Sequence, residues 1–378
     1  MRHIKLGEVC DIIVGRTPPR ADPSTWGGDA PWVSIADMNQ GLSITSTKER
    51  ISTAGAAKGR LIPAGTVLLS FKLSIGKVAR AGMPLYTNEA IAALPVRDPG
   101  KVDAAYLLRA LQAQDLTGGS NRAAMGSTLN KAALQAITVP LPPLGEQRRI
   151  AAILDQADAI RTKRRQVLAQ LSGLKSSRFS EVARQQGGEY TPLGDLLDFL
   201  TSGSRGWAKH YSETGDPFIR IQNVGGGTLD LTDIAYVQAP DTAEARRTLV
   251  RSGDVLVSIT ADLGRTAVIP PELGRGYVNQ HMAILRAPDL VPEFLAHYLE
   301  SAEGRRQLMK KNRGQVKAGL NFDDIRSVEV PTTAREVQQE FADFCHLVDQ
   351  QLEAAKAVQT QDDDLFASLQ ARAFRGEL

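Results

Sequence analysis

Residues 144–186 read LGEQRRIAAILDQADAIRTKRRQVLAQLSGLKSSRFSEVARQQ, a run without proline that follows Pro140, Pro142 and Pro143. Arg164 and Arg178 share one stripe of this run with apolar side chains. Because an α-helix turns once in about 3.6 residues, the steps of three and four in this stripe predict a long helix with a narrow apolar seam. The apolar members of the stripe are Ile150, Ile153, Ala157, Ile160, Val167, Leu171 and Leu174.

Residues 335–378 repeat this pattern at the end of the sequence, with Gln359 and Asp362 as polar interruptions. The first stretch has 9 basic and 4 acidic side chains, whereas the second has 4 basic and 9 acidic ones. Opposite charge favours pairing of the two helices, antiparallel within the chain. The alternative is two separate surface helices with solvated charges. The predicted inter-helix or partner-contact residues are Ile150, Ile153, Ile160, Val167, Leu171, Leu174, Phe341, Val348, Leu352, Phe366 and Leu369.

Length and composition are those of a globular protein of two or three domains: 378 residues, 42% hydrophobic and 23% charged. No apolar run is long enough to span a membrane, and the opening MRHIKLGEV lacks the apolar core of a signal peptide. Two cysteines are too few for a disulfide framework, so a cytoplasmic location is expected. Residues 1–186 carry 25 basic and 14 acidic side chains, against 20 and 28 in 187–378, so only the first half is basic as a block.

The second half of the sequence repeats the first. Its matches keep their order, and the offset between them drifts only from 186 to 191. One period of this length indicates a duplicated domain, whereas repeats of about 20–50 residues would indicate a solenoid. The matched pairs are 6–8 with 193–195, 31–35 with 217–221, 65–70 with 253–258, 75–77 with 263–265, Asn88 with Asn279, 129–130 with 320–321, and 139–140 with 330–331.

Each half has mixed α and β character. The glycine-bounded apolar runs GTVLLSF and GDVLVSIT predict strands, and the periodicity of 105–114 and 292–311 predicts helices. Long loops rich in Gly, Pro and Ser cover 15–31 and 201–217. The sequence therefore predicts an α+β protein with two tandem globular domains, 1–143 and 187–334, separated by two long helices, 144–186 and 335–378.

Sequence motifs of catalysis are lacking. Ser74-Ile75-Gly76-Lys77 ends like a phosphate-binding loop, but Phe71 stands where its first glycine belongs and Val78 where Ser or Thr belongs. There is no HExxH motif and no Asn-Pro-Pro-Tyr-like motif of an amino-methyltransferase. These observations favour a binding protein over an enzyme and predict neither a metal site nor a cofactor in this chain.

The remaining candidate chemistry is recognition of nucleic acid. Arg can grip guanine, Asn can grip adenine, and Lys mainly holds phosphate. Basic residues at matching places in the two long loops strengthen this interpretation, although each alone could be a solvated surface charge. The predicted DNA-binding residues are Arg16, Arg20, Lys72, Lys77, Arg122, Arg205, Lys209, Arg220, Asn223, Arg265, Arg313 and Lys317.

The segment PLPPLGEQRRI at 140–150, leading into the long helix, resembles the specificity subunits of type I restriction–modification systems, as do VLLS at 67–70, IGKVA at 75–79 and the closing AFRGEL. The second copy departs from this pattern, because Thr332 and Thr333 replace the later prolines and Val337-Gln338 stands for Glu146-Gln147. The resemblance covers essentially the whole chain.

The resemblance implies that each globular domain is a target-recognition domain that reads one half of a split, asymmetric double-stranded DNA site. The paired helices would then set the gap between half-sites and dock two methyltransferase subunits, which would bind S-adenosylmethionine and methylate adenine. Restriction-translocase subunits would join in the full complex, and this chain would be non-catalytic. Three alternatives stay open: a self-contained DNA enzyme, a coiled-coil adaptor that binds protein, and a specificity subunit of a defence or modification system without a nuclease.

Overall fold

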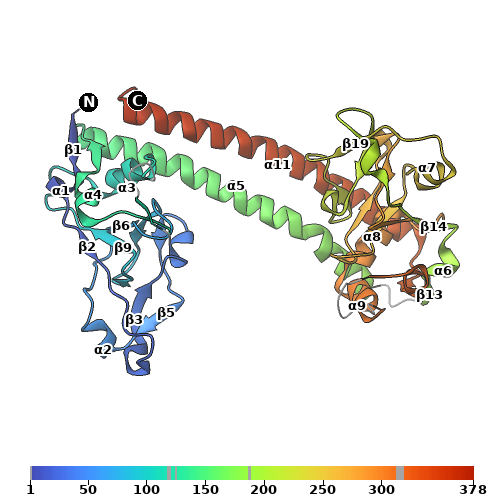
Figure 1. Cartoon of the computed structure of the whole chain (residues 1–378), viewed down its shortest axis with the longest axis horizontal. Helices are drawn as coiled ribbons and strands as arrows, with labels where there is room; N and C mark the ends of the chain where they lie inside the picture. The colour runs from blue at the N-terminus through green and yellow to red at the C-terminus, as the bar shows by residue number, and fades with distance from the viewer. Residues whose placement is uncertain (1, 117–120, 124–125, 186–188, 312–318) are drawn as a thin grey trace. The chain divides into compact units, whose positions relative to one another are not determined.

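The computed structural model describes residues 2–116, 121–123, 126–185, 189–311 and 319–378. The chain forms two compact units: unit 1 is Met1–Arg165 with Val358–Leu378, and unit 2 is Gln166–Ala357. The long helices α5 (Leu144–Gln185) and α11 (Arg335–Arg375) each contribute to both units. Both predicted long helices are thus confirmed (Figure 1).

Unit 1 contains a five-stranded sheet in the order β2-β9-β6-β7-β4 and a three-stranded sheet in the order β5-β3-β8. The pairings β4–β7 and β3–β8 are parallel, and the other pairs in these two sheets are antiparallel. The strands of these sheets are β2 (Ile13–Val14), β3 (Trp26–Val33), β4 (Ser43–Ile44), β5 (Glu49–Ile51), β6 (Val67–Ser70), β7 (Val78–Ala81), β8 (Tyr86–Thr87) and β9 (Ile91–Leu94).

The rest of unit 1 consists of two strand pairs and short helices. Strand β1 (His3–Lys5) pairs with β12 (Thr138–Pro140), and β10 (Asn121–Ala123) pairs with β11 (Gly126–Thr128). The helices are α1 (Leu6–Val9), α2 (Thr53–Ala56), α3 (Ala104–Gln112) and α4 (Lys131–Ala136), with short 3-10 turns at Pro23–Thr25 and Asp37–Asn39.

Unit 2 repeats this plan with two four-stranded sheets, β14-β23-β20-β21 and β15-β19-β16-β22, and the strand pairs β13–β24 and β17–β18. The strands are β13 (Tyr190–Pro192), β14 (Phe199–Ser202), β15 (Tyr211–Ser212), β16 (Asp216–Ile219), β17 (Val224–Gly225), β18 (Thr228–Leu229), β19 (Ala235–Val237), β20 (Val255–Ser258), β21 (Thr266–Val268), β22 (Tyr277–Val278), β23 (Met282–Arg286) and β24 (Glu329–Pro331). The helices are α6 (Leu193–Leu196), α7 (Ala243–Thr248), α8 (Pro292–Glu300), α9 (Ala302–Lys311) and α10 (Phe322–Arg326), with 3-10 turns at Trp207–His210, Ile221–Asn223 and Pro271–Leu273.

The helix predicted over 292–311 is two helices, α8 and α9, separated by Ser301. The backbone of Ser301 is extended, and its hydroxyl accepts a hydrogen bond from Gly304 N at 3.2 Å. Serine favours this N-cap geometry over the interior of a helix. A side chain at Gly304 would also meet the carbonyl of Tyr298, because a Cβ there would lie 2.2 Å from that oxygen. The prediction of one continuous helix is therefore wrong.

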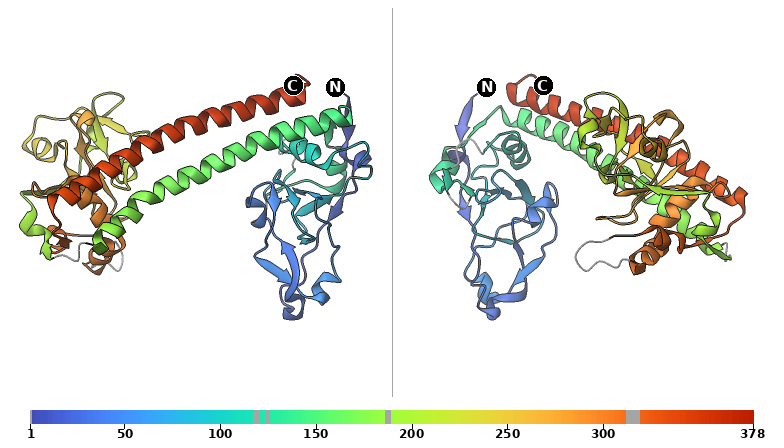
Figure 2. Two further views of the ribbon diagram at one scale, coloured as in Figure 1. Left: turned by 180° about the vertical axis from the view of Figure 1, so that it is seen from behind. Right: turned by 45° about the vertical axis from the view of Figure 1, so that its right-hand side comes forward.

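Each unit buries the same kind of core, and α5 and α11 help to close it. In unit 1, Ile150 and Leu154 of α5 and Phe366 of α11 join a buried cluster with Leu107 and Leu111 of α3. In unit 2, Phe179 of α5 lies with its ring centroid 5.4 Å from those of Phe294 and Phe341. Figure 2 shows α5 and α11 side by side within each unit from two further directions. Removing this much aromatic and aliphatic surface from water is the main stabilising contribution to each unit.

Glycines at matching positions confirm that the duplication extends to the backbone. A Cβ at Gly15 would lie 2.2 Å from the carbonyl oxygen of Asn88, and one at Gly203 would lie 2.1 Å from that of Asn279. Both glycines let the start of a long loop pass directly against a neighbouring chain segment. The repeat predicted from sequence is therefore present as one framework built twice.

Candidate nucleic-acid interface

The turn between β6 and β7 and the turn between β20 and β21 are the most closely matched loops of the two units. In the first, Ser70 Oγ accepts a hydrogen bond from Lys77 N at 2.9 Å, and Ser70 O accepts one from Gly76 N at 3.0 Å. In the second, Ser258 Oγ accepts from Arg265 N at 2.9 Å. Each turn therefore ends in a basic residue whose backbone is fixed by a serine hydroxyl.

The tips of these two turns also share an unusual backbone conformation. Leu73 has φ of 64° and Ala261 has φ of 61°, and they are the described non-glycine residues with positive φ. Residues other than glycine rarely adopt this left-handed region because the Cβ crowds the backbone. Backbone strain of this kind is concentrated at functional sites.

The basic side chains of the two turns are only partly engaged. Lys77 Nζ donates to Asn39 Oδ1 at 2.7 Å, and Lys72 Nζ lies 5.4 Å from the centroid of the Phe71 ring. Arg265 is 32% exposed, with Nη1 3.7 Å from Asp262 Oδ2. Because such exposed pairings contribute little free energy, phosphate can compete for these cations.

In the first long loop the structure brings Arg16 and Arg20 together through an aromatic pair. The Trp32 indole donates to Arg16 O at 3.0 Å, and Arg20 lies over the Trp26 ring at 4.0 Å from its centroid. Arg20 also forms a two-pronged ion pair with Glu49, which lowers the pKa of that carboxyl. Arg20 is therefore held in a defined orientation at the surface, and the exposed Arg16 side chain donates from Nη1 to Lys58 O at 3.3 Å.

The corresponding loop of unit 2 presents its basic side chains differently. Arg205 and Lys209 are exposed on either side of Trp207, which is only 6% exposed. The Trp207 ring packs against Phe218 and Tyr277, and its indole donates to Ser204 Oγ at 3.1 Å. Trp207 is therefore part of the core of unit 2, and the loop offers cations without an aromatic platform.

Two predicted DNA contacts in unit 2 have structural partners instead. Asn223 is 2% exposed, accepts from Arg220 N at 3.1 Å and donates to the carbonyls of Asp230 and Asp233. Its amide is fully used in closing a turn, so the prediction that Asn223 contacts DNA is wrong. Arg220 is 27% exposed and donates to Asp233 O at 2.8 Å, so only part of its side chain is accessible to DNA.

For three predicted DNA contacts the structure describes no side chain. Arg122 lies in β10, where its backbone pairs with Ser127. Arg313 and Lys317 lie outside the described residues. Their roles stay predictions.

The predicted inter-helix or partner-contact residues are all covered on α11, whereas on α5 some are covered and others are exposed. Phe341, Val348 and Phe366 are buried, and Leu352 and Leu369 are half-buried. On α5, Ile150 is buried, and Ile153 and Leu171 are half-buried. By contrast, Ile160, Val167 and Leu174 are 46%, 45% and 40% exposed, so they are not covered between the helices, and their prediction as partner contacts stays a prediction.

Charged side chains explain two of these three positions, because Ile160 and Leu174 are each followed in sequence by a better-covered basic residue, whereas Val167 is followed by the half-buried Leu168. Lys175, which is 6% exposed, places Nζ 2.5 Å from Asp349 Oδ1 in unit 2. In unit 1, Arg161 places Nε 2.6 Å from Asp363 Oδ1 and its guanidinium over the Phe366 ring. Ion pairs between a basic and an acidic helix therefore take positions that an apolar pattern assigns to isoleucine and leucine.

Sequence reasoning missed the role of two matched glutamines. Gln147 is completely buried; its Oε1 accepts from Asp103 N, and its Nε2 donates to Lys101 O and Pro142 O, each at 2.9 Å. Gln338 is equally buried, accepts from Val291 N at 2.9 Å and donates to Thr333 O at 2.7 Å. Each glutamine fastens the start of a long helix to its globular domain. The signal was present in sequence, since the glutamine of the PLPPLGEQ segment persists in the second copy.

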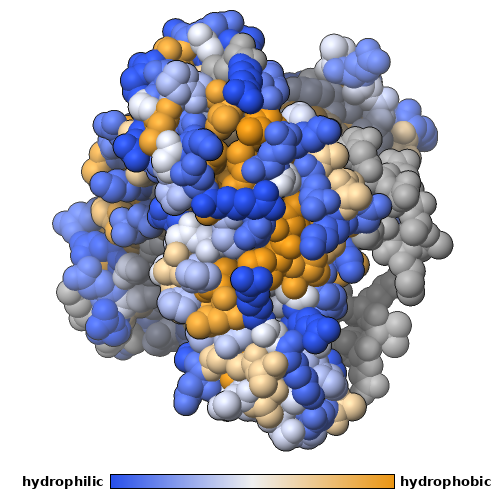
Figure 3. Space-filling model, turned by 90° about the vertical axis from the view of Figure 1, so that its left-hand side faces the viewer, coloured by the Kyte–Doolittle hydropathy of each residue, from blue (hydrophilic) through white to orange (hydrophobic). Residues whose placement is uncertain are grey.

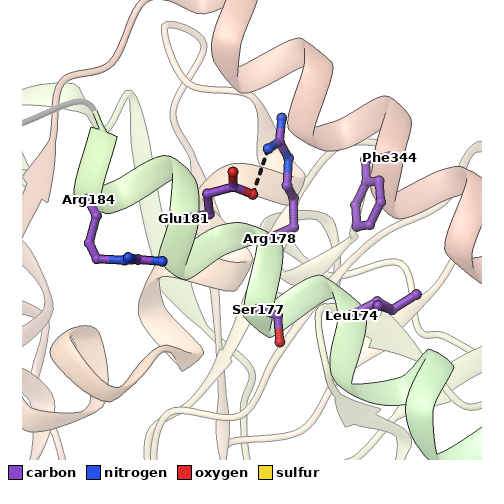
Figure 4. Close-up of a pocket in the computed structure, with 6 residues that line it drawn as sticks. All are labelled: Leu174, Ser177, Arg178, Glu181, Arg184 and Phe344. Atoms are coloured by element: carbon purple, nitrogen blue, oxygen red, sulfur yellow. Dashed lines mark hydrogen bonds and ion pairs between the residues drawn. The ribbon is translucent and has the colours of Figure 1, made fainter.

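A shallow, open groove of about 600 Å³ lies in unit 2 between α5 and α11 (Figure 4). Leu174 and Arg178 of α5 and Phe344 of α11 line it, and Arg178 Nη1 pairs with Glu181 Oε2 at 2.8 Å. The groove is wide and mixes apolar with satisfied polar side chains. It suits contact with a protein surface better than enclosure of a small substrate.

Other types of site are not indicated in the described part of the chain. No group of three or more His, Cys, Asp or Glu side chains there is arranged to hold a metal ion, and none of the helices described there is both long and apolar enough to cross a membrane. Burial raises the pKa of Cys10 and of Cys345 to about 12, so neither thiol has the character of a nucleophile. Figure 3 shows apolar surface gathered at the centre of one face, with hydrophilic side chains around it.

Comparison with known proteins identifies the duplicated unit. A family model described as the type I restriction modification DNA specificity domain matches residues 1–171 and again 187–361. The MjaIX specificity subunit of Methanocaldococcus jannaschii is 27% identical over 59% of this chain, and the EcoBI specificity subunit of Escherichia coli is 25% identical over 66% of it. The matches span 58% and 60% of those relatives' own lengths.

Solved structures share the fold. The S subunit of a type I restriction–modification system from M. genitalium superposes with a TM-score of 0.59 at 14% identity, covering 99% of this chain and 96% of that one. A chain of a type I R–M system complex gives a TM-score of 0.62 at 20% identity, covering 100% and 98%. With a family model that accounts for most of its length in two copies, the chain belongs to the type I restriction–modification DNA specificity family.

Proposed function

We propose that this chain recognises a split, asymmetric sequence in double-stranded DNA, with one half-site read by each unit. The observation that carries the proposal is the duplicated turn, which ends in Lys77 in unit 1 and Arg265 in unit 2 on the same serine-fixed backbone. A framework built twice places equivalent cations on two half-sites, while different side chains around them read different bases. Identical readers would instead suit a palindrome.

In this proposal the chain directs partners that perform the chemistry. Two methyltransferase subunits would bind S-adenosylmethionine and methylate adenine after flipping it from the helix. Restriction-translocase subunits would join for cleavage, and the chain itself would be non-catalytic. Chromosomal and phage DNA are both cytoplasmic in bacteria and archaea, so the proposal places the chain there. A system without a nuclease would use this chain in the same way.

The exposed line of apolar residues on α5 is the proposed contact for the methyltransferase subunits. In unit 2, Val167 and Leu174 are 45% and 40% exposed, so they are available to a partner. Val167→Glu should reduce co-purification of the methyltransferase without unfolding the chain, whereas Ala169→Glu, at an exposed place on another face of α5, should have little effect. Equal co-purification of both variants with the methyltransferase would remove this line from the interface.

The decisive experiment is a genome-wide map of adenine methylation in the source strain with and without this chain. Loss of one split motif with a fixed gap would support the proposal and identify the target. Exchange of residues 15–60 should then change one half-site only, and lengthening α5 by four residues should change the gap but neither half-site. Methylation that is unchanged by deletion would count against the proposal.

A protein-binding adaptor and a self-contained DNA enzyme are the competing functions. Binding to DNA through phosphate contacts weakens steeply as salt is raised, by about one power of salt concentration for each phosphate neutralised. A purified complex whose affinity for DNA is low and independent of salt would favour the adaptor. Modification of DNA by the purified chain alone would favour the enzyme.

A further inference from the structure

The tip of the β6–β7 turn carries a large apolar side chain that the described residues of unit 1 leave mostly uncovered. Leu73 is 73% exposed, which is the highest value among the exposed large hydrophobic residues described. Ser74 N donates to Lys72 O at 2.8 Å and closes a three-residue γ-turn around Leu73. With φ of 64°, this is the rare and strained form of that turn.

The turn itself does not require leucine. In unit 2 the matching position is Ala261, with φ of 61° and the same hydrogen bond from Gly264 N to Ser258 O, at 3.0 Å in both turns. Glycine or asparagine would adopt this backbone conformation with less strain. Leu73 therefore combines two unfavourable features, a strained backbone and apolar exposure, neither of which the fold of the turn explains.

The turn is also held firmly enough to present this side chain. Ser70 Oγ bridges its two ends by accepting from Lys77 N and donating to Ser74 O. Phe71 N donates to Ala90 O at 2.9 Å, which fixes the first limb of the turn against the loop before β9. Because the turn is already ordered, little conformational entropy is lost when its tip enters a binding partner.

The charges around Leu73 indicate what kind of partner it meets. Lys72 precedes it and Lys77 closes the turn, so the apolar tip lies between two lysines in the sequence of the turn. In unit 2 the tip is small, Thr260 replaces Lys72, and Asp262 lies 3.7 Å from Arg265, so the second turn lacks the apolar tip and keeps only one of the two cations. An apolar side chain between cations is the arrangement by which proteins insert a wedge between DNA base pairs while holding the flanking phosphates.

We propose that Leu73 is an apolar wedge that enters the base stack of the half-site read by unit 1, with Lys72 and Lys77 on the neighbouring phosphates. The proposal rests on the function proposed above and adds that the two half-sites are read with different distortion of the DNA. The half-site read by unit 2 would stay stacked at the matching position because Ala261 is too short to separate two base pairs. Pyrimidine–purine steps, which unstack most easily, would be favoured opposite Leu73.

The test uses the chain in complex with its methyltransferase subunits, without S-adenosylmethionine, on the duplex identified by methylation mapping. 2-Aminopurine replaces in turn each adenine that is not the methylated one, because its fluorescence rises when it is unstacked. We expect a rise at one step within the half-site assigned to unit 1. Leu73→Ala should abolish this rise and weaken specific binding by roughly tenfold, the effect of losing about 1.4 kcal/mol.

Two further variants control for the strain of the turn and for the loss of an exposed leucine. Leu73→Gly removes the side chain and also relieves the backbone, so it should lose the fluorescence signal as completely as Leu73→Ala. Leu61→Ala is the matched control, because it shortens a leucine that is 52% exposed elsewhere in unit 1, and it should leave both affinity and fluorescence unchanged.

Three outcomes would overturn the proposal, and they are distinguishable. Unchanged fluorescence and affinity in Leu73→Ala, with specific binding intact, would refute the wedge and leave the proposed function standing. Loss of the methyltransferase from the Leu73→Ala complex on gel filtration would show that Leu73 contacts protein. Absence of any sequence-specific binding by the unmodified complex would refute the proposed function and the wedge with it.

Discussion

Replacing Gln147 by alanine tests whether this glutamine fastens α5 to unit 1. Its side chain is completely buried and makes three hydrogen bonds to backbone groups of Asp103, Lys101 and Pro142. Alanine removes all three bonds and leaves one N–H group and two carbonyls without their partner. A buried polar group that loses its partner costs about 1–3 kcal/mol.

The size of the effect follows from the number of bonds. At about 1 kcal/mol each, the lower end of that range because Asp103 is partly exposed, Gln147→Ala should lose roughly 3 kcal/mol of stability. For a unit of this size such a loss lowers the melting temperature by roughly 6–12 °C. Gln338 makes two such bonds in unit 2, so Gln338→Ala should lose roughly 2 kcal/mol.

The assay is thermal and urea unfolding of the full-length chain, followed by circular dichroism. Gln156→Ala is the matched control, because Gln156 is an exposed glutamine on the same helix and should change stability by less than about 0.5 kcal/mol. A loss for Gln147→Ala no larger than that of Gln156→Ala would refute the structural role assigned to Gln147. A larger loss at Gln338 than at Gln147 would refute the bond-counting argument.

Three further predictions follow from charges in the two units. Asp349→Ala leaves the Lys175 ammonium in unit 2 without its partner and should lower the free energy of unfolding in urea by roughly 2 kcal/mol. This is less than for a fully buried pair, because Asp349 is 37% exposed. Lys175→Met removes the charge itself and should change stability by less than about 1 kcal/mol. Lys77→Ala and Arg265→Ala should each weaken DNA binding and lower the slope of log K against log salt by about one in filter binding; an unchanged slope would mean that the residue does not neutralise a phosphate. Burial lowers the pKa of His297 from 6.5 to about 4, so between these pH values the unfolded chain binds a proton that the folded chain does not. Unit 2 should therefore be fully stable above about pH 6.5 and lose up to about 3 kcal/mol of stability by pH 4. His297→Gln should flatten this pH dependence.

The long helices show what an apolar pattern can and cannot predict. On α11 the stripe predicted from sequence is the covered one, and it includes the buried rings of Phe341 and Phe366. On α5 the residues next in sequence, Arg161 and Lys175, take the covered positions because Asp363 and Asp349 of α11 hold their charges. The opposite net charges of the two stretches were visible in the sequence, but which basic side chains would turn inward depends on the register between the helices.

Polar side chains were harder to assign than the fold. Asn223 and Lys77 are both polar residues of turn-rich stretches. The amide of Asn223 forms hydrogen bonds that close a turn, whereas the side chain of Lys77 extends to the surface. Composition cannot separate these cases because both satisfy the same donor and acceptor rules. Only the path of the backbone around each residue decides whether its hydrogen bonds are already made.

The duplicated framework separates what the two units share from what differs between them. Buried or backbone-contacting residues keep their chemistry, as Gln147 and Gln338 do at the helix starts and Gly15 and Gly203 do at the loop starts. Exposed residues on the same framework diverge, and Leu73 against Ala261 is the sharpest example. If the shared set only builds the fold, exchanging it between units should leave the recognised sequence unchanged, whereas exchanging the exposed set should exchange the half-sites. The shared framework fixes the positions of the exposed side chains but not their identities. This is the arrangement needed to read two different sequences with one fold.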